Sequence, residues 1–434
     1  MSPETTGFFG ILALLFLFLL KVPVAFSMAL VGFVGFAYLS DIDPALAILS
    51  QDIFETFISY PLSVIPMFIL MGSFAHASGI SKRLFSTTYS WVGSLRGGLT
   101  IATVLACAGF AAICGSTAAT AATMGKIALP EMKKYNYDDA LATGTVAAAG
   151  TLGILIPPST VLIVYGILVE ESIGKLFVAG IVPGIILSLL FVATVAILCA
   201  RNPALGPPGP ATTWTAKLKA TKGIIEAAIL FLLAIGGLML GWFSPTQAGA
   251  IGAGGALLIG LVRRKLTWRD FLETGKDGLL TSCMVLFIIA GAVVFGHFLA
   301  VSTIPFKLAD WVGNLAIHRM AVMGIIIFIY FLGGFFMDSL ALVVVTIPIF
   351  YPIVQKLGFD PIWFGVIIVL TGEMGVITPP VGVNVFVIKG IAPEVPLNTI
   401  FGGIFPFLYA IILMTIVVVL FPEIATFLPS LVKY

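Results

Sequence analysis

Long apolar runs separated by short polar segments fill most of the chain. A helix that crosses a bilayer needs about 20 mostly apolar residues, so the longest runs predict about ten membrane-spanning helices. We expect these helices at residues 7–20, 22–39, 62–79, 139–169, 176–199, 223–242, 246–262, 277–301, 361–389 and 398–420.

Two further apolar stretches, residues 97–129 and 320–352, carry small and polar residues at their centres. Each is predicted to be a re-entrant hairpin, in which two half-helices meet inside the membrane. The segments 81–95 and 305–318 precede these hairpins and interleave aromatic with charged residues. That pattern is typical of amphipathic helices at a membrane surface, and we expect each segment to form such an arm.

The amino-acid composition also indicates a protein that is surrounded by lipid rather than by water. The chain is 60% hydrophobic and 10% charged, with a mean hydropathy of +1.15, whereas soluble domains are about a quarter charged. The four cysteines lie in apolar runs without metal-type spacing, so neither a disulfide framework, nor a zinc site, nor a cofactor is expected. The first residues include an acid but no base, so the first run is predicted to be a retained helix rather than a cleaved signal peptide. An all-α integral membrane protein is therefore expected.

The distribution of basic residues predicts the orientation. Lysine and arginine concentrate in cytoplasmic loops, and the basic segments 201–222 and 263–276 flank one helical hairpin and must share a side. With both segments inside, 17 of the 22 basic residues face the cytoplasm. The N-terminus then lies outside the cytoplasm.

The chain also repeats itself. Shifted by 222 residues, Pro130 falls on Pro352, and the pair at 157–158 falls on the pair at 379–380. We predict two repeats, 1–200 and 223–424, joined by a cytoplasmic linker at 201–222. Because one repeat starts outside and the other inside, they are inverted, which is the architecture of many secondary transporters with alternating access.

Each repeat interrupts its helices twice at membrane depth. The first hairpin tip is Cys-Gly-Ser-Thr-Ala-Ala-Thr (114–120), and the second is Phe-Met-Asp-Ser-Leu-Ala (336–341). The spans 139–169 and 361–389 are predicted to break at their paired prolines, which remove backbone donors, beside glycines that permit unwound backbone. Unwound carbonyls attract a cation and half-helix N-termini attract an anion. These oxygen-rich, cysteine-free sites favour Na⁺, although Asp338 keeps proton coupling open.

Acidic residues inside a membrane are functional by default, and two are predicted at this depth. Asp338 sits on the second hairpin tip, whereas Glu373 precedes the second break and could simply pair with a polar neighbour. The alternative for Ser116, Thr117 and Thr120 is that they are small residues that pack helices closely.

At these motifs the chain resembles the large membrane subunit of tripartite ATP-independent periplasmic (TRAP) transporters. The resemblance rests on Gly-Ser-Thr-Ala-Ala-Thr (115–120), Gly-Ile-Leu-Ile-Pro-Pro-Ser (153–159) and Gly-Val-Ile-Thr-Pro-Pro-Val-Gly-Val-Asn (375–384), and it covers nearly the whole chain. It implies sodium-driven import of organic acids such as dicarboxylates and sialic acids. It also implies delivery by a periplasmic binding protein, a small four-helix membrane subunit as partner, and an elevator mechanism. The chain is then expected in the bacterial inner membrane, with its N-terminus in the periplasm. We expect this chain to hold the large subunit alone.

The same resemblance implies the site residues. One sodium would be held by Ser116, Gly150, Gly153 and Pro158, and a second by Asp338, Gly375, Thr378 and Pro380. Substrate would contact Thr117, Ser159, Ser339 and Asn384.

Three other functions stay open at this point. A divalent-anion/sodium symporter that needs no binding protein would share the hairpins and broken spans. A channel is less favoured, because inverted repeats with matched hairpins are rare in channels. An intramembrane enzyme would need a nucleophile–base pair or a metal triad at depth, and the three histidines form no cluster in the sequence.

Overall fold

The protein is built from α-helices. The computed structural model describes residues 1–315 and 317–432, and this part of the chain contains no β-strand. The expected all-α membrane fold is confirmed. Position 316, inside the predicted arm 305–318, lies outside the described residues.

A first group of helices pairs across the two predicted repeats. Its members are α1 (Pro3–Leu19), α2 (Val24–Leu39), α3 (Ile42–Ile58), α4 (Val64–Ala77), α12 (Ile225–Phe231), α13 (Gly237–Met239), α14 (Pro245–Val262) and α15 (Trp268–Ser302). Helix α2 packs along α15, and α4 packs along α14. A π-helical turn joins α12 to α13.

A second group contains the hairpins and the broken helices. Its members are α6 (Gly98–Cys114), α7 (Thr117–Lys134), α8 (Asp139–Leu155), α9 (Thr160–Leu168), α10 (Ile173–Arg201), α17 (Arg319–Gly333), α18 (Ser339–Lys356), α19 (Pro361–Ile377), α20 (Val383–Ile391) and α21 (Leu397–Leu420). Helices α8 and α19 form its core, because all residues of 141–155 and of 363–377 are buried. A short C-terminal helix, α22 (Glu423–Leu431), packs on α10 and is not anticipated by the apolar pattern.

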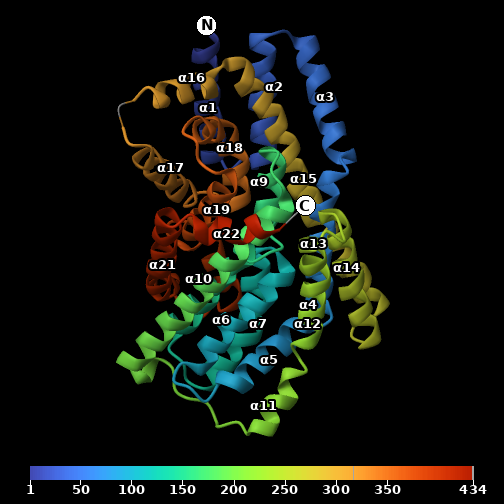
Figure 1. Ribbon diagram of the computed structural model, residues 1–434, viewed down its shortest axis with the longest axis vertical. Helices are drawn as coiled ribbons and strands as arrows, with labels where there is room; N and C mark the ends of the chain where they lie inside the picture. The colour runs from blue at the N-terminus through green and yellow to red at the C-terminus, as the bar shows by residue number, and fades with distance from the viewer. Residues whose placement is uncertain (316, 433–434) are drawn as a thin grey trace.

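The bounds of corresponding helices repeat with the predicted offset. Helices α7 and α8 recur as α18 and α19, with both ends of each helix 222 residues later. The hairpin α6–α7 lies in the lower half of Figure 1 and α17–α18 in the upper half. The arms α5 (Ile80–Val92) and α16 (Ile304–Gly313) likewise lie toward opposite ends. The extents of the two repeats stay a prediction.

Among the described residues, seven helices are long and apolar enough to cross a membrane, and a bent pair would make eight. The expected total of about ten also counted α1, α2 and the broken span 361–389, whose helices α1, α2 and α19 have only 17, 16 and 17 residues. One of the seven is α18, which the sequence pattern assigns to a hairpin.

The third predicted span, 62–79, is only part of a longer element. Helix α3 precedes α4 and meets it at an angle of 54°, so the two together take the place of one span. The sequence pattern misses α3 because acids and glutamine interrupt its apolar residues. The corresponding element of the second repeat, α15, is a single helix of 35 residues.

The predicted linker is hydrogen-bonded along its length. Its first part, before the helix α11 (Trp214–Thr221), accepts bonds from Gly97 N at 2.8 Å and from Asp138 N at 3.0 Å. Its second part lies along α5, where Thr87 Oγ1 donates to Ala220 O at 2.7 Å. The linker therefore contacts both the arm and the second group of helices.

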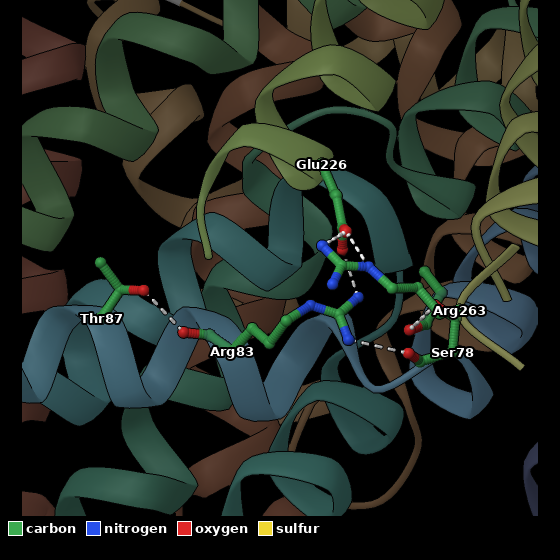
Figure 2. Close-up of polar contacts among 6 residues, drawn as sticks. Ser78, Arg83, Thr87, Glu226 and Arg263 are labelled. Carbon is green, nitrogen blue, oxygen red and sulfur yellow. Dashed lines mark hydrogen bonds and ion pairs between the residues drawn. The ribbon is translucent and has the colours of Figure 1, made fainter. Parts of the chain in front are cut away.

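An ionic cluster holds α5 against the first group (Figure 2). Glu226 of α12 binds Arg83 of α5 and also Arg263, which follows α14. Arg263 Nε donates to Glu226 Oε1 at 2.6 Å, and Arg83 Nη1 donates to the carbonyl oxygen of Ser78 at 3.1 Å. The arm of the first repeat is thus bound to helices of the second.

Candidate functional site

The first break separates α8 from α9. Helix α8 ends at Leu155. Pro157 and Pro158 follow, and neither has a backbone N–H group to donate a hydrogen bond. Ser159 then starts α9 as its N-cap, with Oγ accepting from Leu162 N at 3.2 Å, and its side chain is fully buried. The break therefore leaves a helix C-terminus and a capped helix N-terminus facing one another inside the protein.

The tip of the first hairpin packs into this break. Gly115 O accepts bonds from Thr160 N at 3.4 Å and from Thr160 Oγ1 at 3.0 Å. A methyl group at Gly153 would lie 2.4 Å from Ser116 O, and one at Gly115 would lie 2.8 Å from Pro158 O. The close approach needs residues without side chains at both glycine positions.

The second hairpin and the second break meet in the same way. A methyl group at Gly375 would lie 2.4 Å from the Cα of Gly334, just before the hairpin tip. One at Gly372 would lie 2.7 Å from Ser339 Oγ. Gly382, which precedes α20, adopts a φ of +57°. Residues with a side chain rarely adopt this left-handed backbone conformation.

The aligned tip residues share one local role. Ser116 Oγ accepts from Ala119 N at 3.4 Å, and Asp338 Oδ1 accepts from Leu340 N at 2.9 Å and from Ala341 N at 3.1 Å. Each therefore caps the second helix of its hairpin, which is a role that serine and aspartate commonly have. Asp338 is exposed, so its carboxylate remains accessible while it caps the helix.

The first predicted sodium set is largely brought together. Ser116, Gly153 and Pro158 belong to the contacts between tip and break, whereas Gly150 contacts α7 one turn further on, where its methyl would lie 2.7 Å from the Cβ of Ala121. Thr117, a predicted substrate contact, is the first residue of α7 and is partly buried.

The second set is more open. Gly375 lies against the tip, and Thr378 ends α19 with Oγ1 donating to Met374 O. Pro380 is exposed. Asn384 is fully buried, and its Nδ2 donates to Ala147 O of α8 at 3.0 Å, which ties the second break to the first broken helix.

Several buried oxygens around the second break have no hydrogen-bond partner within the described ranges. They are Ser339 Oγ, Asn384 Oδ1 and both carboxyl oxygens of Glu373. Glu373 is fully buried, so the polar neighbour considered for it is not found among these residues. Unsatisfied buried oxygens in a native fold call for a ligand, an ion or water, and this donor set fits a hard cation.

A cavity of about 220 Å³ adjoins the first hairpin tip. Hairpin residues Cys114, Ser116 and Thr123 form one wall, and residues of α4 and α15, among them His76 and Asp277, form the other. Thr123 Oγ1 and His76 Nδ1 lie 3.2 Å apart across it. Sequence reasoning did not find this wall, because its residues come from distant helices.

Thr160 and Gly334 were also missed, and Gly115 was predicted only as part of the hairpin tip, without a role of its own. The signal for Gly334 was the Gly333–Gly334 pair at the end of an apolar run. Thr160 follows a site residue directly, but nothing in its local sequence shows that it bonds to a residue 45 positions earlier.

The profile of the family described as "Tripartite ATP-independent periplasmic transporter, DctM component" matches residues 11–424. The chain belongs to this family.

Two curated relatives illustrate the range of the TRAP large permeases. The C4-dicarboxylate TRAP transporter large permease protein DctM of Pseudomonas aeruginosa is 38% identical over 387 residues, covering 88% of this chain and 89% of the relative. The sialic acid TRAP transporter large permease protein SiaM of Vibrio cholerae is 30% identical over 424 residues, covering 98% and 97%. These relatives are transporter permeases rather than enzymes.

The fold is similar to a solved structure. The YdaH transporter of Alcanivorax borkumensis superposes with a TM-score of 0.67 at 16% identity, covering 94% of this chain and 97% of that one. At this identity the likeness concerns the fold alone. The TRAP large permease therefore shares its helical arrangement with other membrane transporters.

Proposed function

We propose that this TRAP large permease imports an organic acid in symport with sodium, after a periplasmic binding protein delivers the substrate. A small four-helix membrane subunit would complete the complex in the bacterial inner membrane. The N-terminus would be periplasmic, with α5, α11 and the linker on the cytoplasmic side. The relatives named for C4-dicarboxylate and sialic acid support a carboxylate substrate.

The observation that carries the proposal is the pairing of each hairpin tip with a broken helix. Each pairing places carbonyl oxygens beside hydroxyls, with the Asp338 carboxylate added in the second. Such oxygen donors suit a cation. Ser116, Gly150, Gly153 and Pro158 would hold one sodium, and Asp338, Gly375, Thr378 and Pro380 another.

Substrate would lie between the two ion sites. Thr117 and Ser159 would contribute from the first repeat, and Ser339 and Asn384 from the second. Ser339 Oγ and Asn384 Oδ1 are buried oxygens without a partner among the described residues. Ser339 Oγ–H and the helix N-termini would attract the substrate carboxylate. Asn384 Oδ1 can only accept, so it would bind a hydroxyl group of the substrate or the sodium ion.

Transport would follow an elevator mechanism. Residues 97–199 and 320–420 would move as one unit past the first group of helices. The tight contacts between tips and breaks support this division, because they tie each hairpin to its broken helix.

Uptake of radiolabelled C4-dicarboxylates and sialic acid into proteoliposomes tests the proposal. The vesicles would contain this chain with its small subunit, and the sodium gradient and the binding protein would be varied independently. Uptake that requires both supports the proposal. Uptake with sodium alone would instead make the protein a self-sufficient symporter, non-saturable flux would make it a channel, and indifference to sodium would remove both ion sites.

A further inference from the structure

A second polar cavity lies away from the transport site, between the arm α5 and the hairpin helix α7. Its volume is about 500 Å³. Lys82, Ser86, Tyr89 and Ser90 line it from the arm, and Lys126 and Glu131 line it from the hairpin. Phe85, Ile127 and Pro130 complete the lining with apolar surface.

The two lysines of this cavity are not neutralised. Within the described residues, neither Lys82 nor Lys126 has a carboxylate within the 4.0 Å of an ion pair, although Glu131 shares the cavity. Both side chains are exposed. Two ammonium groups and nearby serine hydroxyls form a set of donors suited to a phosphate.

The corresponding interface of the second repeat is different. There the arm α16 packs on the hairpin helix α18, and Lys356 of α18 forms an ion pair with Asp310 of α16. At the α5–α7 interface, the lysines have no such partner in the part of the chain that the structure describes, and the cavity lies between the two helices. An anion that is not part of the chain would neutralise these lysines, as Asp310 neutralises Lys356 in the second repeat.

The level of the cavity in the membrane indicates the source of that anion. The amphipathic arm α5 ends beside Trp91, whose ring meets that of Trp214 edge-on at 6.2 Å, and both rings are exposed at 39% and 71%. Exposed tryptophans are enriched where a membrane meets water. Phospholipid phosphates lie at this level, and anionic lipids attract clustered lysines there.

We propose that the cavity between α5 and α7 binds the phosphate of an anionic phospholipid. The two ammonium groups and the hydroxyl of Ser86 contact the phosphate, and Phe85, Ile127 and Pro130 contact the glycerol and the first acyl carbons. The lipid bridges the arm, which Glu226 ties to the first group of helices, and the hairpin of the second group. The side of the membrane follows the proposed orientation, but the binding itself does not depend on sodium or on substrate.

Lipid retention by the purified full-length chain tests this. The chain is incubated with phosphatidylglycerol or phosphatidylcholine, washed, and examined by native mass spectrometry for bound lipid. Wild type is expected to keep phosphatidylglycerol in preference to phosphatidylcholine. The double variant Lys82→Gln/Lys126→Gln should bind at least about tenfold less phosphatidylglycerol, because each basic residue near the surface contributes severalfold.

Two control variants separate the site from general charge. Lys82→Arg/Lys126→Arg keeps both charges and should retain the lipid, which also shows that the cavity tolerates substitution. Lys217→Gln/Lys219→Gln removes the same charge from α11, outside the cavity, and should leave retention unchanged. Equal loss in this second pair would overturn the proposal, and so would full retention in Lys82→Gln/Lys126→Gln.

A free phosphate must be distinguished from a lipid phosphate. Inorganic phosphate in millimolar excess should not displace phosphatidylglycerol, because it has no glycerol or acyl carbons to contact the apolar wall. Displacement by inorganic phosphate would overturn the assignment to lipid.

Discussion

Gly334 and Gly375 lie so close that neither position can carry a side chain. A methyl group built at Gly375 would come within 2.4 Å of the Cα of Gly334, and one at Gly334 within 2.7 Å of the Cα of Gly375. Backbone contact of this kind joins the second hairpin to the end of α19, so the geometry of the second break depends on two glycines that are distant in sequence.

Gly375→Ala should therefore separate the hairpin from the break. Overpacking of a well-packed interior typically costs about 1–3 kcal/mol, and the displaced tip should raise the sodium concentration needed for half-maximal uptake. Thermal unfolding in detergent and sodium titration of uptake measure the two effects. Gly402→Ala is the matched control, because nothing lies within 4 Å of a methyl group there; an equal loss in both variants would contradict the explanation.

Asp338→Asn separates the capping role from the charge. Asparagine caps helices about as well as aspartate, so the unfolding temperature should stay close to that of wild type. The loss of a negative ligand should weaken sodium activation at least about tenfold, which corresponds to about 1.4 kcal/mol. Asp360→Asn, at the N-cap of α19 where Asp360 accepts from Trp363 N at 2.9 Å, should change neither quantity. Unaltered sodium activation in Asp338→Asn would remove Asp338 from the ion site.

Asn384→Ala should affect both packing and substrate. It removes the buried hydrogen bond that Asn384 Nδ2 donates to Ala147 O, and the net contribution of such a bond to stability is about 0.5–1.5 kcal/mol. If Asn384 also contacts substrate, the KM for uptake should rise severalfold while the sodium dependence stays the same. Loss of stability with an unchanged KM would restrict the residue to packing.

Glu226→Gln should loosen the arm α5. Two arginines would then face a neutral side chain, and we expect the free energy of unfolding to fall by about 1–2 kcal/mol. This is less than for a fully buried ion pair, because Arg263 is half exposed. The unfolding temperature should fall by a few degrees. Glu273→Gln, which breaks an exposed pair with Arg269 within one helix, should leave it unchanged. Similar shifts in both variants would show that the cluster has no special role.

Most helices could be predicted because their signals are local. Apolar runs marked the spans, and paired prolines with neighbouring glycines marked both breaks, since these residues act on the backbone wherever they occur. The internal repeat extended this information, because the first hairpin and the second predict one another.

The features that could not be predicted from the sequence are contacts between residues that lie far apart along the chain. Helix α3 was missed because Asp52 interrupts its apolar pattern, and only the fold places this acid 3.3 Å from His297 of α15. The contact of Gly334 with Gly375 was missed for the same reason. No local sequence pattern identifies His297 as the partner of Asp52, or Gly375 as the partner of Gly334. Contacts of this kind therefore cannot be predicted from a single sequence.

The bond between Arg83 and Glu226 also bears on how the protein is made. Glu226 emerges from the ribosome 143 residues after Arg83, and at about 5–20 residues per second this delay is roughly 7–30 s. During that time the first repeat has already been synthesised, but Arg83 in its arm cannot pair with Glu226, because that residue has not yet been made. The ion pair between the arm of the first repeat and α12 therefore forms only after synthesis of the second repeat has begun.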